Sequence, residues 1–485
     1  MNTRPTNRRK HVITALALLG VGAGALLAVA LEQIEVPPRL LAPYLEHRLS
    51  GHGDLMSDAG RRLAQTLTAL DRGEPRSPQP LALALGLGAQ PEAAMRVASS
   101  GRDVVVASPA EALAAIRTAQ PGDAITFRPG IYRFDGEGIP VGRPGTADAA
   151  ITVRAQRPGT VTLELDLVEG FLVSAPHWRF ENLTLRGVCA QHSRCEHAFH
   201  VVGKATHFAA RNNTVVDFNA HFKINGEGGR MPDHGVIEGN TINNTSARET
   251  DAPVTPIDLV AASHWIIRGN LISDFIKAQG NRISYGAFAK GGGVDNRFER
   301  NAVLCEVRLR GAPGWRVGLS LGGGGSEAAH CRDGRCIIEQ DGGVIHSNLI
   351  ASCSDDGIYV NRAATSSIVH NTLIDTGGIS VRFAHSSAEV EGNLVDGVIR
   401  SRDGAVLHAT DNLQTAASRL YLGTHPWRAL YRDAGAFDFA WSGDPPRRRS
   451  AGTASIDLCG VPRPPHPAYG SFEDFTPCLR AADPK

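Results

Sequence analysis

A short strand pattern that ends at an asparagine recurs along most of this chain and constrains its fold more than any other feature. In each copy an apolar strand is followed by a polar pair, an asparagine and a second apolar strand, as in "IEGNTINNT", "IRGNLISDF" and "IVHNTLIDT". The repeated asparagines are Asn182, Asn213, Asn240, Asn270, Asn301, Asn348, Asn371 and Asn393, with Asn412 as a weaker copy. Asparagine tolerates the left-handed turn conformation, and stacked amides can hydrogen-bond along a ladder. The pattern predicts an all-β chain folded as a right-handed parallel β-helix, with coils about 4.8 Å apart.

The spacing of the asparagines indicates where function should lie. The intervals after Asn348 are the shortest and approach the length of a bare coil, whereas the earlier intervals are longer. The earlier coils must therefore carry extra loops, and loops held on a rigid scaffold are where binding and catalytic sites are usually built.

The N-terminus predicts export. Four basic residues lie within the first ten, and Val12 to Leu31 then runs for 20 residues without a charge. This length can span a bilayer, and the basic flank predicts a cytoplasmic N-terminus, an inner-membrane anchor and a periplasmic chain. The alternative is a secreted chain whose signal peptide is cut after Ala30.

Composition changes divide the rest of the chain. "SPAEALAAIRTAQPGD" predicts a capping helix, because Ser108 and Glu111 form a capping box and Pro121 stops the helix. The predicted divisions are a basic segment and anchor (1–31), a membrane-proximal helical stalk and linker (32–104), the β-helix (105–412) and a C-terminal cap over the open end (413–485).

Charge and cysteine content exclude some classes of function. Lys plus Arg (50) nearly equals Asp plus Glu (49), so no basic excess predicts a nucleic-acid partner. The 8 cysteines agree with an oxidising compartment. Their spacing suggests Cys189 with Cys195, Cys331 with Cys336 and Cys459 with Cys478, while Cys305 and Cys353 could bridge or simply stack in the core. A zinc site formed by Cys189, His192, Cys195 and His197 is the alternative.

The segments "AEALAAIRTAQPGDAITFRPGIYRF" and "AAITVRAQRPGTVTLE", together with the asparagine-turn coils, resemble a known superfamily. They are similar to the pectin-lyase-like β-helix proteins, in particular to the chondroitinase-B and alginate-lyase branch (polysaccharide lyase family 6). The resemblance covers roughly residues 105–412. It implies cleavage of an acidic polysaccharide by β-elimination.

The resemblance also implies site residues. The family's catalytic lysine lies in a stretch similar to "AFAKGGGVDNRFERN", which maps the base onto Lys290, and its assisting arginine maps onto Arg310 or Arg316. The family usually places acidic calcium ligands five and seven residues before the lysine, where this chain has Tyr285 and Ile283. The resemblance therefore does not make any cofactor certain. Ca²⁺ remains an open alternative.

Other residues are candidates on chemical grounds. Tyr285 could act as acid or base, and Arg282 could bind a carboxylate. Further candidates for substrate binding precede them along the chain: His221, Lys223, Asn225, Glu227 and Asp258. The first three alternate, so one strand should point them all outward toward a ligand. Asp258 could orient a neighbouring cation or cap a turn.

These features predict an extracytoplasmic enzyme that cleaves a uronate-containing polysaccharide by β-elimination. Its expected partners are the acidic polysaccharide and the membrane, and the oligomeric state is left open. A C5-epimerase would use similar groups, and a non-catalytic polysaccharide-binding scaffold of the cell envelope is the alternative from another class. The Asp355–Asp356 pair suggests a hydrolase more weakly, because Asp-Asp-Gly is also an ordinary turn.

Overall fold

The computed structural model describes residues 35–50, 53–73, 85–90, 100–323, 325–449 and 455–479. The predicted anchor or signal segment, Val12 to Leu31, lies outside this set. Among the residues it contains, no helix is long and apolar enough to cross a bilayer. Contacts divide the chain into two compact units, one of helices and one built around the β-solenoid.

The helical unit contains α2 (Pro38–Leu49), α3 (Asp54–Arg72) and α5 (Ala417–Tyr421). The first two lie in the stretches where apolar spacing predicts stalk helices. Arg39 and Asp71 form a buried ion pair at 2.6 Å between them. Tyr421 of α5 donates its hydroxyl hydrogen to the carbonyl of Val36 at 3.1 Å. The sequence did not reveal that a segment from near the C-terminus completes this unit.

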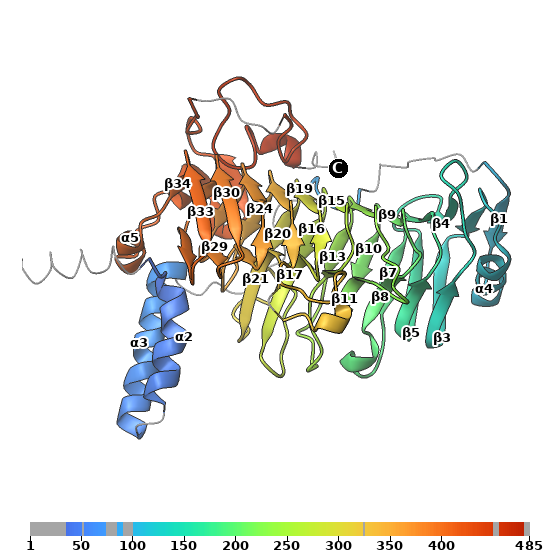
Figure 1. The fold of residues 1–485 in the computed structure, drawn as a ribbon, viewed down its shortest axis with the longest axis horizontal. Helices are drawn as coiled ribbons and strands as arrows, with labels where there is room; N and C mark the ends of the chain where they lie inside the picture. Colours follow the sequence, from blue (N-terminus) through green and yellow to red (C-terminus); the bar gives the residue numbers. More distant parts are fainter. Residues whose placement is uncertain are drawn as a thin grey trace, which may run out of the picture. The chain divides into compact units, whose positions relative to one another are not determined.

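The solenoid is built from short parallel strands that repeat on successive coils (Figure 1). Its 12-stranded sheet contains β1 (Asp103–Val106), β2 (Ala124–Phe127), β4 (Ile151–Ala155), β6 (Trp178–Glu181), β9 (Ala209–Arg211), β12 (Val236–Glu238), β15 (Ile266–Arg268), β19 (Arg297–Glu299), β23 (Val344–His346), β27 (Ser366–Val369), β30 (Ser387–Glu391) and β33 (Val406–Thr410). The parallel pairing confirms the predicted parallel β-helix.

A 19-stranded sheet supplies two further rows of strands. The turn row follows the ladder asparagines and contains β7 (Thr184–Gly187), β10 (Thr214–Val216), β13 (Thr241–Asn243), β16 (Leu271–Ser273), β20 (Ala302–Leu304), β24 (Leu349–Ala351), β28 (Thr372–Ile374), β31 (Leu394–Val395) and β34 (Leu413–Gln414). The site row contains β3 (Gly130–Val141), β5 (Val161–Val173), β8 (His197–Val202), β11 (Ala220–Asn225), β14 (Ile257–Val260), β17 (Ile283–Lys290), β21 (Trp315–Leu321), β25 (Ile358–Asn361), β29 (Gly378–Arg382) and β32 (Val398–Arg402). The long strand β5 pairs with both β7 and β8 and so joins the two rows.

Two small sheets complete the strands. One is parallel and contains β18 (Gly293–Val294), β22 (Gln340–Asp341) and β26 (Ala363–Ala364). The other is an antiparallel pair, β35 (Tyr431–Asp433) and β36 (Asp438–Trp441).

The predicted capping helix is α4 (Pro109–Thr118). The Ser108 side chain accepts a hydrogen bond from the Glu111 backbone N–H at 3.2 Å, and the Glu111 carboxylate accepts one from the Ala107 N–H at 2.7 Å. Ala112 and Ile116 of this helix join the apolar core, which is continuous through the coils. Helix α4, which begins at this capping box, therefore closes the N-terminal end of the core as the sequence predicts.

The asparagine ladder is present, but its turn geometry differs from the prediction. From Asn213 to Asn412, each side chain donates from Nδ2 to the Oδ1 of the next asparagine at 2.9 to 3.0 Å. The left-handed conformation falls on the preceding residue, such as Gly239 (φ 64°) or Arg300 (φ 54°), and only Asn182 itself adopts it. The residue in the left-handed turn and the ladder asparagine occupy adjacent positions. The asparagine side chain must point into the coil, so the asparagine cannot also lie at the outer corner of the turn.

The C-terminal segment differs from the predicted end cap. Its aromatic residues, including Tyr431 and Phe472, pack against outward-facing side chains of the turn row such as Leu304 and Leu349. Residues 85–90, assigned to the stalk linker from sequence, also pack along the solenoid, where Gly88 N–H bonds to the carbonyl of Gly269 at 3.1 Å. Both segments cover an apolar outward face of the solenoid. The repeat pattern alone does not show whether an apolar residue of a strand points outward or into the core.

All 8 cysteines are paired. The bonds predicted from spacing are present: Cys189–Cys195, Cys331–Cys336 and Cys459–Cys478. Cys305 and Cys353 form the fourth bond and join neighbouring coils. The cysteine zinc site is therefore excluded in this structure, because its thiolates are used in a disulfide.

Candidate functional site

The outward face of the site row carries a line of polar and aromatic side chains in one register. His200 of β8 lies opposite Lys223 of β11, Lys223 opposite Asp258 of β14, and Asp258 opposite Phe288 of β17. The residues that alternate with them, such as Phe222 and Ile224, are buried in the core. Strand alternation therefore presents one row of polar and aromatic groups across four successive coils.

A polar cluster occupies the first part of this line. His200 Nδ1 lies 2.7 Å from Glu169 Oε2, and its Nε2 lies 2.7 Å from Asn225 Oδ1. Lys223 Nζ donates to Asp258 Oδ2 at 2.9 Å. Asp258 is only 3% exposed, and its Oδ1 has no hydrogen-bond partner among the described residues. We call Glu169, His197, His200, Lys223, Asn225 and Asp258 the polar cluster.

The electrostatics of the cluster reflect burial and pairing. Burial opposes ionisation of Glu169, but the hydrogen bond to His200 and the neighbouring His197 and Lys223 outweigh it and lower the pKa of Glu169. Burial lowers the pKa of His197 to about 4. His197 is therefore a neutral ligand or hydrogen-bonding group near neutral pH.

The structure separates the residues predicted to form one outward row on β11. Lys223 and Asn225 do face outward and are half-buried. His221 is fully buried, contacts Phe218 edge-on and places Nε2 3.0 Å from the carbonyl of Asn243. The strand begins at a corner of the coil, so its first positions are enclosed by the preceding turn. The predicted outward position of His221 is therefore wrong.

Glu227 lies beyond the end of β11, exposed in a turn closed by reciprocal backbone hydrogen bonds with Arg230 at 3.0 Å. This turn follows Asn225 of the polar cluster directly. Glu227 therefore remains a predicted substrate-binding residue at the rim of the cluster.

The second part of the line is the end of β17. Lys290 Nζ lies 4.5 Å from the centroid of the Phe288 ring, and none of the described carboxylates lies within ion-pairing distance of it. Tyr285 contacts Phe288 edge-on, with centroids 5.6 Å apart. Two predicted catalytic residues are thus brought together around one aromatic ring. We call Tyr285, Phe288 and Lys290 the lysine platform.

Tyr285 is packed in a largely apolar environment that also contains Val260 and Met231. Burial, reinforced by Tyr359, Asp355 and Asp356, raises the pKa of Tyr285. Its phenol therefore stays protonated near neutral pH and can donate, but not accept, a proton. Arg282 is exposed just before β17, and its Nε donates to the carbonyl of Ala278 at 3.1 Å.

The two candidate arginines have other partners. Arg316 is 2% exposed; its Nε donates to Glu306 Oε1 at 3.0 Å, and its Nη1 and Nη2 donate to carbonyls of residues 312–314. Its guanidinium braces the loop before β21 and presents no donor to a substrate. Arg310 contacts Asp375 at 3.6 Å and the carbonyl of Gly435 at 3.4 Å, next to the turn row and away from Lys290.

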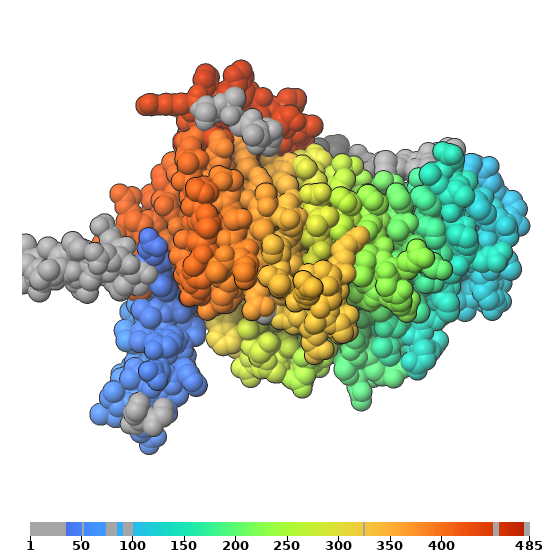
Figure 2. Space-filling view, in the orientation of Figure 1, coloured from blue at the N-terminus to red at the C-terminus, as the bar shows by residue number. Residues whose placement is uncertain are grey.

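An insertion between β21 and β22 stands beside the lysine platform. It is coloured gold in the space-filling view and projects from the coils (Figure 2). Arg332 donates its backbone N–H to the Gly291 carbonyl at 2.8 Å and pairs with Asp233 at 2.8 Å. A Cβ at Gly323 would lie 2.8 Å from Lys290 Cδ, so the insertion approaches the lysine side chain closely.

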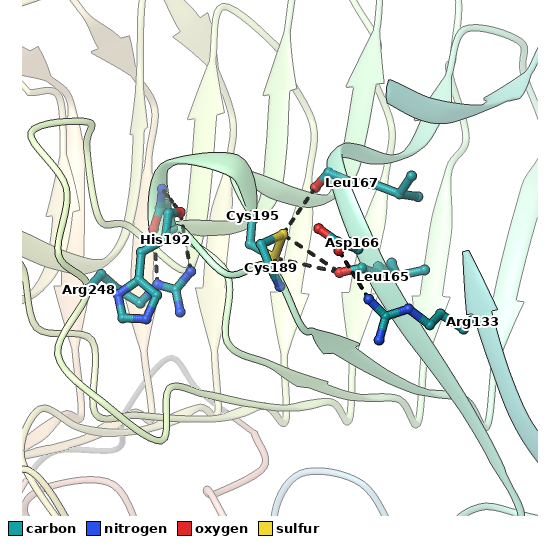
Figure 3. The surroundings of a disulfide bond; sticks show 9 residues. Arg133, Leu165, Asp166, Leu167, Cys189, His192, Cys195 and Arg248 are labelled. Carbon is teal, nitrogen blue, oxygen red and sulfur yellow. Dashed lines mark hydrogen bonds and ion pairs between the residues drawn. A yellow bond between two sulfur atoms is a disulfide. The ribbon is translucent and has the colours of Figure 1, made fainter. Parts of the chain in front are cut away.

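Sequence reasoning missed Glu169 and interpreted His200 as packing or hydrogen-bonding locally, without a role in the site. They come together through pairing of β5 with β8, which no local pattern reveals. The Cys189–Cys195 loop lies directly before β8 and rests against the carbonyls of Leu165 and Leu167 of β5 (Figure 3). The available signal in the sequence was the short spacing between Cys189 and Cys195, just before His197 and His200.

Comparison with known proteins defines the fold. Pectate lyase Pel9A matches with a TM-score of 0.51 and 14% identity, over 74% of this chain and 90% of that one. The chain has the parallel β-helix fold of Pel9A. A rhamnogalacturonan lyase (TM-score 0.45, 12% identity, 64% of this chain and 87% of that one) and an alginate lyase from Paenibacillus sp. str. FPU-7 (0.36, 15%, 64% and 95%) also match. No protein-family model and no curated protein matches the sequence.

The residues at the positions of the expected calcium ligands do not fit that ion. Ile283 is exposed and apolar, and Tyr285 packs against Phe288. Calcium requires several oxygen ligands, usually carboxylates. We therefore derive no chemical step through calcium.

Proposed function

We propose that this protein cleaves an acidic, uronate-containing polysaccharide by β-elimination, with Lys290 as the base. The observation that carries the proposal is the contrast between two lysines on one outward face. Lys223 is paired with Asp258 at 2.9 Å, whereas Lys290 has no carboxylate partner among the described residues. A carboxylate partner holds a lysine in the ammonium form, so we assign the role of base to the lysine that has none.

The other groups supply the remaining requirements of β-elimination. The uronate carboxylate must be neutralised before its C5 proton can leave, and the departing O4 needs a proton. Lys223 retains donors beyond the one given to Asp258, and Asn225 lies beside it, so both can hold the carboxylate. Tyr285 donates the proton to O4, since burial keeps its phenol protonated.

The shared fold supports a polysaccharide-active protein without assigning a substrate, because one fold hosts many activities. The four disulfides support export, since such bonds persist in oxidising compartments. We propose that segment 12–31 anchors the protein in the inner membrane with the solenoid in the periplasm.

The test incubates the full-length protein with alginate, pectate, chondroitin and heparin and follows the ultraviolet absorbance of the unsaturated uronate. We expect absorbance to rise with the wild-type protein and not with Lys290→Ala. Absorbance with both proteins would overturn the role of Lys290. Inverted uronate stereochemistry without absorbance would indicate an epimerase, and binding without either change would indicate a scaffold.

A further inference from the structure

Three side chains with metal-binding groups converge where β5 meets β8. We infer that Glu169, His197 and His200 bind one divalent transition-metal ion such as Zn²⁺. One ligand atom from each lies within 4.8 Å of the others, and no other trio of His, Cys, Asp or Glu in the described part of the chain does so. This inference goes beyond the proposed lyase activity and does not depend on it.

The ligand atoms all lie within 4.8 Å of one another, so side-chain movement can bring them to the spacing that an ion requires. Bonds of about 2.0–2.1 Å in tetrahedral geometry place nitrogen and oxygen ligands roughly 3.3 Å apart. The His200 Nδ1 to Glu169 Oε2 separation is 2.7 Å, so it would widen by less than a bond length. The His197 and His200 rings, with centroids 5.0 Å apart, are already in edge contact.

The hydrogen bonds of His200 provide the second argument. Asn225 donates from Nδ2 to the Gly226 carbonyl at 3.0 Å, which orients its Oδ1 toward His200 Nε2. Both ring nitrogens therefore face oxygen acceptors, while a neutral imidazole has only one N–H. This arrangement suits metal binding at Nδ1, which would leave Nε2–H donating to Asn225, as metal-bound histidines usually donate to a nearby oxygen.

His197 supplies an otherwise unused group. Its side chain is 13% exposed, and its Nδ1 is buried with no hydrogen-bond partner in the described structure. Its Nε2 lies 3.8 Å from Glu196 Oε2, which places a further carboxylate at the edge of the trio. A buried polar atom without a partner costs free energy unless it gains a ligand.

Ligand chemistry selects the class of ion. Two imidazoles and one carboxylate suit Zn²⁺ and neighbouring transition metals, whereas Ca²⁺ and Mg²⁺ prefer oxygen ligands alone. Three protein ligands leave one coordination position open. Under the proposed function, which this step alone assumes, the open position would be available to the uronate carboxylate together with Lys223 and Asn225.

The test uses the untagged full-length protein after treatment with a chelator. Zn²⁺ binding is measured by calorimetry, and Co²⁺ is added as a visible-absorption probe of its ligands. We expect one ion per chain. His200→Asn and Glu169→Gln should each weaken binding by at least about tenfold. Circular dichroism checks that each variant is folded, and His197→Gln provides an independent variant.

A stack of histidines, exposed at all members but the half-buried His177, provides the matched control. His177, His207, His234 and His264 stack on successive coils with centroids 4.6, 5.2 and 4.8 Å apart. His234→Asn removes one of them and tolerates its left-handed backbone (φ 65°). Loss of binding in this variant alone, unchanged binding in the trio variants, or no binding by the wild-type protein would overturn the inference. Because the readout is binding, absence of lyase activity would leave the result intact.

Discussion

The polar cluster and the lysine platform lie on neighbouring coils of one outward face, yet they are organised in opposite ways. In the cluster, Lys223 is paired with Asp258 and His200 lies between Glu169 and Asn225. On the platform, Lys290 lies over an aromatic ring and Tyr285 packs against the same ring. A network of partners fixes the position and charge of its members, whereas an unpaired group remains able to exchange a proton. Under the proposed function, this difference favours substrate orientation by the cluster and proton transfer by the platform.

The largest expected effect comes from replacing the base without removing its charge. Lys290→Arg keeps a cation over Phe288 but substitutes a group that does not deprotonate in proteins. We expect elimination to slow by at least about 100-fold, the lower range for loss of general base catalysis. Initial rates of unsaturated product formation measure this change, and thermal unfolding should be nearly unchanged.

Retention of more than a tenth of the wild-type rate in Lys290→Arg would show that the charge, and not the base, matters at this position. The assignment of proton transfer to the lysine platform would then be lost, and Tyr285→Phe would become the next variant to measure.

For Lys223, the lysine of the polar cluster, we expect replacement to change the free energy of unfolding. Lys223→Met leaves the Asp258 carboxylate buried and unpaired, which should cost about 3 kcal/mol of unfolding free energy. The double variant Lys223→Met/Asp258→Leu should recover much of that loss, whereas Lys290→Met should cost less than about 1 kcal/mol. Denaturant titration checks all three. Equal losses for the two single lysine variants would remove the distinction between the regions.

A smaller effect, on the pH dependence of stability, is expected for the buried residue His221 of β11. Burial lowers the pKa of His221 to about 4; Arg248 adds to this, and the Asn243 carbonyl and Asp217 oppose it. The unfolded chain takes up this proton near pH 6.5 and the folded chain only near pH 4, so stability falls as pH decreases between these values. From pH 6.5 to 5 the loss should be roughly 2 kcal/mol. In the presence of chelator, His221→Asn should lose less stability over this range; an identical pH profile would contradict the assignment.

The solenoid could be predicted because its signals are local and repeated. Each coil carries its own apolar strands and ladder asparagine, so the period is visible without knowing which coils touch. The turn conformation was misplaced because sequence cannot show whether Asn240 or Gly239 occupies the outer corner. The lateral packing of the C-terminal segment was missed because outward apolar residues such as Leu304 look like core residues in the repeat.

The site was less predictable, since it depends on register between coils with loops of different length. Strand alternation correctly placed Lys223 and Asn225, which lie in the second half of β11, beyond the corner at which the strand begins. It failed for His221 at the corner. Spacing within a family resemblance pointed to Arg316, but Glu306 lies only ten residues before it and takes its guanidinium. The contact of Glu169 with His200 spans 31 residues and follows from no local pattern.

The asparagine ladder gives the solenoid a direction as well as a shape. Asn240 Oδ1 accepts both the backbone N–H of Asn213 at 2.9 Å and its Nδ2–H at 3.0 Å, and the following links repeat this arrangement. Opening the stack at an interior coil would therefore leave two buried donors unpaired at once, whereas the two donors of Asn393 that Asn412 accepts at the C-terminal end are only partly buried and can bond to water. Thermal fluctuations should be concentrated at the two ends. The coils that carry Lys223, Asp258 and Lys290 are interior, so the distances between these side chains are held by the most resistant part of the molecule.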